Sequence, residues 1–533
     1  MSYVDRSALV TDARNAAGLL GGGIATLATG AFIAGWATLL QWLDLSGSYA
    51  GFSLSTWFGG ALLVLGVGLA LAALGTRAGF LETTPDDGAG LLVAVVFGLL
   101  WGAVGLLLTG ALIDGAGAWI GALVGSIVGL ALALGPREDF GSTLPPAAFL
   151  GLVGALLYTD FIGRDFVFDP GWTAAIFPGA AIVPGLVIFG SLLAVWSGGK
   201  VAAGFGPQGR QRGIYYLIGL AIASMLGVLA LLIGFIIVEG LDVLLTGASL
   251  FGGSLRIPGL GFSLPVPQLP FLTNVTGGLY VEVPGVLPAA IGTLWLVFGA
   301  ILLAVPTGVG AAIFLTEYAE QGRFTQVVEV ATNGLWSTPS IVFGLFGLAF
   351  LVPRISGGNS IVVGQLVLGF MLLPLVVITS REAILAVPDG YRDASAALGV
   401  SRWETIKSVV VPAAMPGVIT GVILGVGRIA GETAPLLLVF GGPPYPSSTP
   451  NVLGSFALST RPPFITNEAL LEPASALPYQ LYSSITAGVF PKEIFTDTEF
   501  GWGTALVLLL VVIGLYAIGV LSRLYFRKKL HHE

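Results

Sequence analysis

The stretch REAILAVPDGYRDASAALGVSRWETIKSVVVP, residues 381–412, is a charged segment between two long apolar runs. Pro388 favours a helix start, the alanine-rich residues after it favour helix, and Gly399 is a residue type that commonly ends one. Ser401, with Glu404 three residues later, has the pattern of a capping box that opens a second helix. The segment therefore predicts two short helices joined by a glycine turn.

The composition on both sides of this segment is that of a membrane protein. Of 533 residues, 55% are hydrophobic and only 10% are charged, whereas soluble domains carry about 25% charged residues. A helix needs about 20 apolar residues to cross the hydrocarbon core of a bilayer. We therefore predict an all-α fold, a polytopic transmembrane helical bundle of about 12 spans. The runs are 17–43, 58–75, 89–112, 116–134, the short run 147–162, 173–197, 214–239, 287–315, 329–353, 360–380, 413–440 and 502–522.

The positive charges assign a side of the membrane to each connecting segment. With the N-terminus inside, sixteen of the 22 Lys and Arg residues fall in inner segments, five fall in outer segments and Arg428 lies within a span. Inner loops of membrane proteins carry an excess of Lys and Arg. This bias predicts a multi-pass cell-membrane protein with both termini in the cytoplasm and residues 381–412 on the cytoplasmic face.

Spacing within this inner segment resembles a known signature. Asp393-Ala394-Ser395 is followed by three residues and Gly399, then by nine residues, Val409, one residue, Val411 and Pro412. This resembles the EAA motif of ABC importer permeases, with Asp for Glu, Ser for Ala and Val for Ile and Leu. The resemblance implies that Asp393, Ala394, Ser395, Gly399 and Pro412 couple the chain to a separate ATP-binding subunit. The alternative is an ordinary amphipathic surface helix.

Three further stretches resemble one branch of that family, the phosphate importer permeases of the PstA type. They are AAIFLTEYA at 311–319, STPSIVFGLFG at 337–347 and GRIAGETAPLL at 427–437. The related PstC-type permeases are the sequences most easily confused with this branch, but the GETAP run is more similar to the PstA type. The resemblance implies phosphate as the transported anion, a second, PstC-like permease subunit and an external phosphate-binding protein, for which the long outer segments 242–286 and 441–501 are candidate docking surfaces.

The domain organisation follows from a Gly-rich polar stretch and from the extent of the resemblance. Residues 1–197 form an N-terminal membrane region of unknown role, and residues 198–213 are predicted to be a cytoplasmic linker. The resemblance makes residues 214–526 a six-span ABC importer permease core. Residues 527–533 form a cytoplasmic tail, and the basic residues around its start predict contact with anionic membrane lipid.

Arg428 and Glu432 are the candidate translocation residues. They lie four residues apart, which places them on one helix face. An arginine near the middle of the 413–440 span costs about 2.5–3.5 kcal/mol and must face protein or a water-filled path. Its planar fork suits a tetrahedral oxyanion, and Thr433 and Ser340 could add hydroxyl donors. The alternative is a structural ion pair that braces two helices.

Several other function classes are excluded or disfavoured by the sequence. The chain has no G-x-x-x-x-G-K-[ST] motif, so nucleotide hydrolysis belongs to a partner and the chain itself is not an enzyme. With no Cys and two His, we expect no cofactor and no metal site, and a net charge of −7 gives no basic surface for nucleic acid. The rival readings are an ion-gradient-driven secondary transporter of an anion, which would need paired midplane acids and repeated halves, and a membrane-embedded enzyme.

Overall fold

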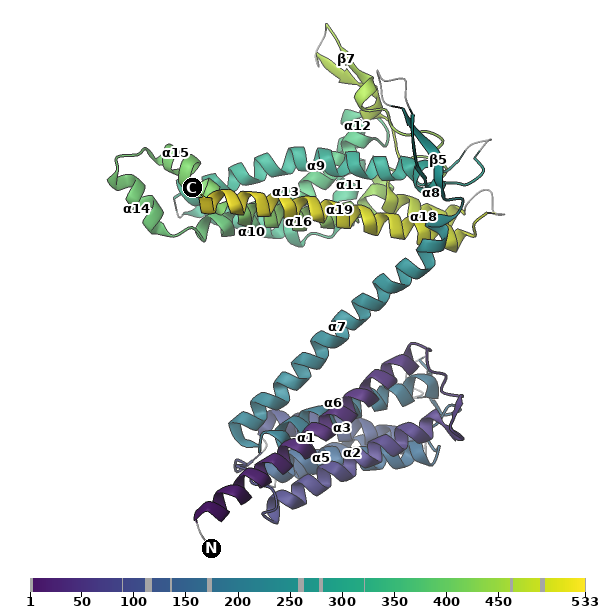
Figure 1. The fold of residues 1–533 in the computed structure, drawn as a ribbon, viewed down its shortest axis with the longest axis vertical. Coiled ribbons are helices and arrows are strands. Elements are labelled where there is room, and N and C mark those ends of the chain that lie inside the picture. Colours follow the sequence, from purple (N-terminus) through teal and green to yellow (C-terminus); the bar gives the residue numbers. More distant parts are fainter. Residues whose placement is uncertain are drawn as a thin grey trace. The chain divides into compact units, whose positions relative to one another are not determined.

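The computed structural model describes residues 3–532 except 89, 111–116, 135–136, 170–174, 257–262, 278–280, 321, 461–463 and 489–493. The chain divides into two compact units, Met1–Leu229 and Ala230–Glu533. In the described residues, 11 helices are long and apolar enough to cross a membrane, or up to 12 if a pair bent by 101° is one span. The predicted polytopic all-α fold is confirmed (Figure 1).

Helices of the first unit pack as three pairs, α1 with α6, α2 with α5 and α3 with α4. A continuous core that includes Leu62, Leu150 and Val187 joins the pairs. Gly105 and Gly121 bring α3 and α4 into backbone contact, because a Cβ atom at either position would collide with the opposite helix. The helices are α1 (Tyr3–Leu39), α2 (Leu54–Arg77), α3 (Leu91–Gly110), α4 (Gly117–Leu134), α5 (Glu138–Tyr158) and α6 (Gly179–Ala202). Residues 147–158 of the run 147–162, predicted as a short span, are the C-terminal part of α5, a 21-residue helix, and the last four residues of the run follow that helix.

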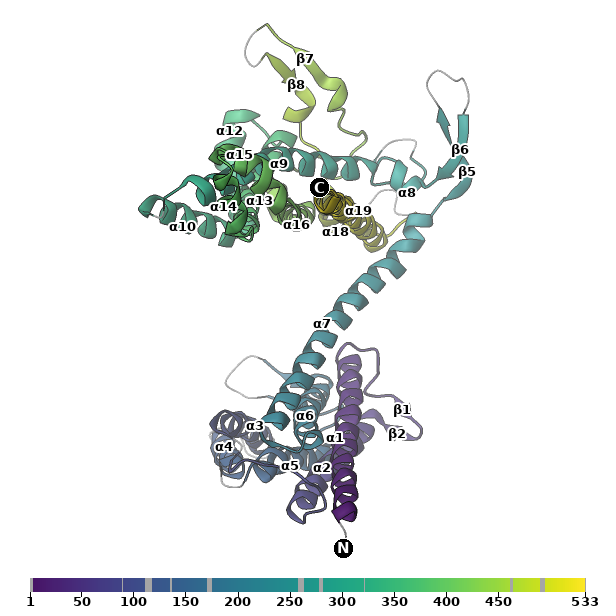
Figure 2. The same cartoon turned by 60° about the vertical axis from the view of Figure 1, so that its left-hand side comes forward.

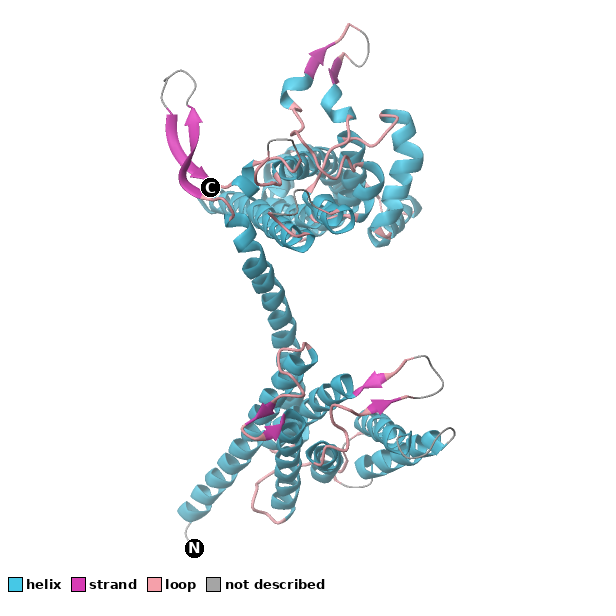
Figure 3. Cartoon of the chain, turned by 90° about the vertical axis from the view of Figure 1, so that its right-hand side faces the viewer, coloured by secondary structure: helices cyan, strands magenta, loops and turns pink. Residues whose placement is uncertain are grey.

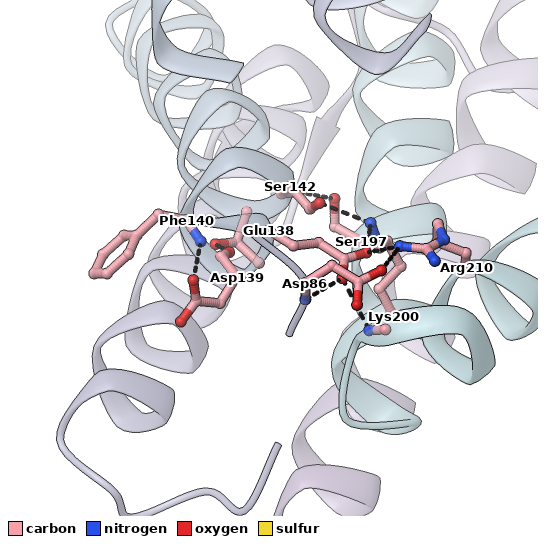
Figure 4. Close-up of polar contacts among 10 residues, drawn as sticks. Asp86, Glu138, Asp139, Phe140, Ser142, Ser197, Lys200 and Arg210 are labelled. Carbon is pink, nitrogen blue, oxygen red and sulfur yellow. Dashed lines mark hydrogen bonds and ion pairs between the residues drawn. The ribbon is translucent and has the colours of Figure 1, made fainter. Parts of the chain in front are cut away.

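A buried polar network closes one end of this unit (Figure 4). The Nζ atom of Lys200 lies 2.7 Å from Oε1 of Glu138, and both side chains are fully buried. Lys200 also donates to the hydroxyl of Ser142 at 2.7 Å. The other oxygen of Glu138 accepts the backbone N–H groups of Gly206 at 2.9 Å and Asp86 at 3.1 Å. Because each buried charge has several partners, the network fixes the starts of α5 and α7 and the end of α6 against one another.

Residues 198–213, predicted to be a linker loop, are almost wholly helical. They comprise the end of α6, a tight turn and the start of α7 (Gly206–Leu245), the 40-residue helix that runs from the first unit into the second. Gly204, Phe205 and Gly206 of the turn all have positive φ angles. The Gly-rich composition therefore marks a tight helix–helix turn, and the cytoplasmic position of this segment stays a prediction.

The second unit is built around one central helix, α13. It packs against α9, α16, α10, α11 and α17, and Val367, Leu368 and Leu372 on it are almost completely buried. The helices of the unit are α8 (Pro270–Thr273), α9 (Leu287–Ile313), α10 (Arg323–Ser337), α11 (Ser340–Phe346), α12 (Val352–Ile355), α13 (Ile361–Leu385), α14 (Asp389–Ala397), α15 (Arg402–Thr405), α16 (Val411–Ala430), α17 (Ala434–Val439), α18 (Leu477–Ala487) and α19 (Asp497–His532). Short π-helical segments extend several of these: η1 (Phe314–Tyr318), η2 (Gly347–Leu351) and η3 (Ile406–Val410).

The strands among the described residues form four two-stranded hairpins, drawn in magenta in Figure 3. The first unit holds β1 (Ser48–Tyr49) with β2 (Phe52–Ser53) and β3 (Val167–Phe168) with β4 (Phe177–Pro178). The second holds β5 (Ser249–Arg256) with β6 (Ser263–Gln268) and β7 (Phe456–Leu458) with β8 (Ile465–Asn467), joined to the 3₁₀ helices η4 (Leu453–Ser455) and η5 (Glu468–Leu471). All four pairs are antiparallel.

Two ends of the second unit differ in construction. Figure 1 shows α14 and α15 at one end of its long helices and β5, α8 and α18 at the other. Figure 2 shows β7 and β8 projecting beyond the helices. The predicted outer segments 242–286 and 441–501 therefore contain hairpins and short helices, and they lie away from the predicted inner segment 381–412.

The buried network predicts a measurable loss of stability in Lys200→Met. That substitution leaves Glu138 buried without its main partner, and breaking a buried ion pair costs about 3–5 kcal/mol. We expect a clearly lower thermal unfolding midpoint for the purified protein in detergent. Lys528→Met, at an exposed residue of α19, is the matched control and should unfold with the wild type. Equal midpoints for the two variants would contradict the assigned role of Lys200.

Candidate functional site

The two short helices predicted within residues 381–412 are present as α14 and α15. Gly399 between them has a φ of +75°, a left-handed conformation that glycine adopts without strain. From Arg402 the chain continues without a break through α15, η3 and α16, and this 29-residue helix ends at Ala430. The second short helix is therefore the first part of a long span. We call residues 389–412 the inner element.

The predicted capping box is only half formed. The hydroxyl of Ser401 accepts the backbone N–H of Glu404 at 3.3 Å, as expected for an N-cap residue. The carboxylate of Glu404 does not return to the N–H of Ser401 and instead accepts the hydroxyl of Ser408 at 2.8 Å. The prediction was right for Ser401 and wrong for Glu404, because a serine one turn further along offers Glu404 a side-chain donor.

Glu317, at the end of α9 in η1, holds the inner element in place. Its carboxylate accepts the guanidinium of Arg392 from α14 at 2.7 Å, and its side chain is only 8% exposed. Its backbone carbonyl accepts the guanidinium of Arg402 from α15. Arg392 also donates to the carbonyl of Val387 at 2.8 Å. Because an unpaired buried carboxylate is costly, these contacts fix both short helices to the end of α9.

The inner element presents an apolar face that nothing in the described chain covers. Tyr391 is 54% exposed, Leu398 82% and Trp403 57%. Large exposed apolar side chains of this kind mark surfaces that contact protein or membrane. Ile406 and Val410, further along the same segment, are buried.

The residues predicted to couple the chain to an ATP-binding subunit occupy different parts of this element. Asp393 and Ala394 are exposed on α14, whereas Ser395 is buried and donates to the carbonyl of Tyr391 at 3.0 Å. Gly399 forms the turn described above. Pro412 is half-buried near the start of α16. An external partner would therefore meet Asp393 and Ala394, while the other three positions shape the element.

Arg428 lies at a helix end, which corrects its predicted position near the middle of a continuous 413–440 span. The helix stops at Ala430, and α17 begins only at Ala434. Nε of Arg428 is 3.6 Å from Oε1 of Glu432 across this break, so the predicted pairing is present without a continuous helix. The guanidinium carbon also lies 4.6 Å from the ring centre of Trp336, the last residue but one of α10.

The hydroxyl residues predicted to assist Arg428 are at the starts of two short helices. Ser340 begins α11, and Thr433 directly precedes α17. These helices pack together, and a Cβ atom on Gly344 would press against Pro435. Among the described side chains, neither hydroxyl makes a hydrogen bond to Arg428. The structure thus brings Arg428, Glu432 and Trp336 together and leaves Ser340 and Thr433 as neighbours on adjoining elements.

The sequence reasoning missed three contacts of this site. Arg392 and Arg402 were counted only as inner positive charges, although both bind Glu317. Trp336 was not considered, although its ring faces Arg428. The available signal for the first two residues was a carboxylate, Glu317, two residues after the apolar run 287–315 and on the same predicted side of the membrane as these arginines. The described residues contain no group of three or more His, Cys, Asp or Glu that could hold a metal ion.

Comparison with known proteins matches residues 304–532 to the family of binding-protein-dependent transport system inner membrane components. The chain is 32% identical over 246 residues to the probable ABC transporter permease protein YqgI of Bacillus subtilis, covering 46% of this chain and 80% of that protein. It is 33% identical over 274 residues to the phosphate transport system permease protein PstA of Haemophilus influenzae, covering 51% and 84%. It is 40% identical over 157 residues to PstA 1 of Mycobacterium tuberculosis, covering 30% and 51%.

The chain belongs to the ABC importer permeases, in the PstA-type branch. Permeases of this family are transport subunits and not enzymes, and they act with an ATP-binding subunit and a substrate-binding protein. The chain is accordingly a multi-pass protein of the plasma membrane. The alternative of an ion-gradient-driven secondary transporter is not favoured.

The turn of the permease's inner element offers a matched pair of glycine variants. A Cβ atom has open space at both Gly390 and Gly399, but only Gly399 has a positive φ. Gly399→Ala should therefore strain the turn by about 1–2 kcal/mol, whereas Gly390→Ala within α14 should be neutral or slightly stabilising. Hydrogen–deuterium exchange of residues 389–405 should quicken in Gly399→Ala alone. Equal exchange in both variants would show that the turn is not held in this conformation.

Proposed function

We propose that this permease moves inorganic phosphate into the cell, forming half of the translocation path. Relatives named as PstA support phosphate as the substrate, since two of them are 33% and 40% identical to this chain. Another strongly similar relative is named only as a probable ABC transporter permease. The choice of phosphate therefore depends on the chemistry of the path as well as on these names.

The single observation that carries the proposal is the setting of Arg428. Its side chain is 41% exposed while its partner Glu432 is 17% exposed, so the guanidinium has an open side. Arginine keeps its charge at neutral pH and binds tetrahedral oxyanions through its planar fork. A carboxylate 3.6 Å away offsets that charge when no anion is present. This weak pairing suits a site that must bind an anion and then release it.

The helix break next to Arg428 supports the same role. Interrupted helices within membrane proteins are tolerated where they line a cavity or are buried in protein. Here the broken segment 431–433, which includes Glu432 and Thr433, separates the helix that carries Arg428 from α17. Ser340 lies at the bend between α10 and α11, a second interruption. We assign Arg428, Glu432, Thr433 and Ser340 to the translocation path, with a structural brace as the alternative for the charged pair.

The partners follow from the two ends of the second unit. The inner element is the proposed contact for the ATP-binding subunit: Asp393 and Ala394 would meet it, while Ser395, Gly399 and Pro412 shape the element that couples to it. The hairpin end is the proposed contact for an external phosphate-binding protein. One arginine is a thin counter-charge for a divalent anion, and a second, PstC-like permease would contribute another across a shared interface.

The proposed topology places both termini in the cytoplasm. In this arrangement residues 1–197 are a separate membrane region, 198–213 a cytoplasmic connection, 214–526 the permease core and 527–533 a cytoplasmic tail. Arg523, Arg527 and Lys528 lie along the last turns of α19, where they would meet anionic lipid headgroups. The last residue of that tail, Glu533, lies outside the described residues.

Arg428→Ala is expected to abolish phosphate uptake, because it removes the charge that attracts the anion. The measurement is uptake of radiolabelled phosphate by proteoliposomes that contain the complete transporter with its binding protein and internal ATP. Co-purification of the ATP-binding subunit should be unchanged, since Arg428 is remote from the inner element.

Arg354→Ala is the control for this experiment. Arg354 is also an exposed arginine stacked on an aromatic ring, 4.1 Å from the centre of Phe350, but it has no carboxylate partner among the described residues. This variant should keep its uptake. Wild-type uptake in Arg428→Ala would rule out a role for Arg428 in the path.

A further inference from the structure

A second arginine–glutamate pair lies on the same face of α10 as Trp336. Glu329 precedes Trp336 by seven residues, which is two helical turns and about 10 Å along the axis. Its Oε1 lies 2.5 Å from Nη2 of Arg381 on α13. Thus one face of α10 meets Arg428 near its C-terminal end and Arg381 closer to the inner element, which begins four residues after α13 ends.

A small cavity surrounds the second pair. Its volume is about 160 Å³, which is below the range of about 300–1,000 Å³ usual for drug-sized ligands and suits a small ion. Three apolar side chains and five polar ones line it, the latter being Glu329, Thr332, Asn333, Arg381 and Glu382. The hydroxyl of Thr332 already donates to the carbonyl of Val328 at 2.7 Å. The amide of Asn333 is exposed and makes no hydrogen bond among the described residues, so its N–H donors can meet water or a ligand.

This pair adds little to the stability of the fold. The side chains of Arg381 and Glu329 are 26% and 35% exposed, and ion pairs open to solvent contribute between nothing and about 1 kcal/mol. Thr332, Asn333 and Glu382 would add nothing to such a brace. The cavity brings together one cation, two carboxylates and an amide with free donors, and this set suits a ligand that both accepts and donates hydrogen bonds.

Resting on the proposed function, we infer that Arg381, Glu329 and Asn333 form a second, inner station for the transported anion. The anion leaves Arg428, passes along α10 and is held at Arg381 before release. The station selects a protonated oxyanion. Ionised carboxylates only accept hydrogen bonds, so Glu329 or Glu382 can accept a hydrogen bond from a P–OH group of phosphate, whereas sulfate, which carries no proton at neutral pH, has no donor to offer and is repelled.

Product inhibition tests this station from the inner side. Proteoliposomes with the complete transporter and internal ATP are loaded with unlabelled phosphate or with sulfate, and the initial uptake of labelled external phosphate is measured. Internal phosphate should slow wild-type uptake and internal sulfate should not. Arg381→Gln should raise the internal phosphate concentration that halves uptake by about tenfold or more, as expected for loss of a charge-assisted hydrogen bond.

Inhibition of the Glu329→Gln variant by internal sulfate is a result that a purely structural ion pair would not produce. The amide can donate to sulfate, so internal sulfate should become inhibitory in this variant. Glu320→Gln, an exposed glutamate outside the cavity, is the control and should behave as wild type. Should Arg381→Gln fail to assemble, Arg381→Lys keeps the charge, loses the planar fork and should weaken inhibition by a smaller factor.

The possible results separate the station from the proposed function. Absence of phosphate uptake by the wild type would overturn the proposed substrate. Normal uptake with unchanged inhibition in Arg381→Gln, or equal inhibition of the wild type by sulfate and phosphate, would overturn the inner station alone.

Discussion

One buried glutamate organises the face of the permease that we propose as the contact for its ATP-binding subunit. Glu317 ends the α9 span and binds Arg392 of α14 through its carboxylate and Arg402 of α15 through its carbonyl. Since the carboxylate is almost completely buried, leaving it without a partner would be costly. The two short helices are therefore anchored to the end of α9. Their exposed apolar side chains, Leu398 above all, are then held at fixed positions for a partner.

The same element is joined to the proposed anion site by continuous helix. The span that starts at Arg402 runs unbroken to Ala430 and carries Arg428 in its last turn. A helix of 29 residues is about 43 Å long, so a displacement at its first turn can reach the break beside Glu432. On the other side of the element, α13 passes through the core of the unit. A displacement of the inner element by the ATP-binding subunit would thus act on both α16, which carries Arg428, and the central helix α13.

Much of this arrangement could be predicted, and the errors share a physical cause. Apolar run lengths gave the spans, and Pro388, Gly399 and Ser401 gave the inner helices, because these signals are local to the chain. Arg428 was misplaced because the break at residues 431–433 is only three residues long and has apolar sequence on both sides, so the two helices look like one span. The bend of 101° within the predicted span 329–353 was hidden in the same way. The partners of Glu317 and Arg381 depend on tertiary packing, which residue spacing alone does not encode.

Site-specific cross-linking tests the central claim, that the ATP-binding subunit binds the inner element. The chain has no native cysteine, so a single introduced cysteine reports one position. Leu398→Cys lies on the inner element and Leu458→Cys on the hairpin at the other end of the unit, and these side chains are 82% and 89% exposed. With a short thiol–amine cross-linker and the assembled transporter, Leu398→Cys should link to the ATP-binding subunit and Leu458→Cys should not. A link from Leu458→Cys and none from Leu398→Cys would contradict the account.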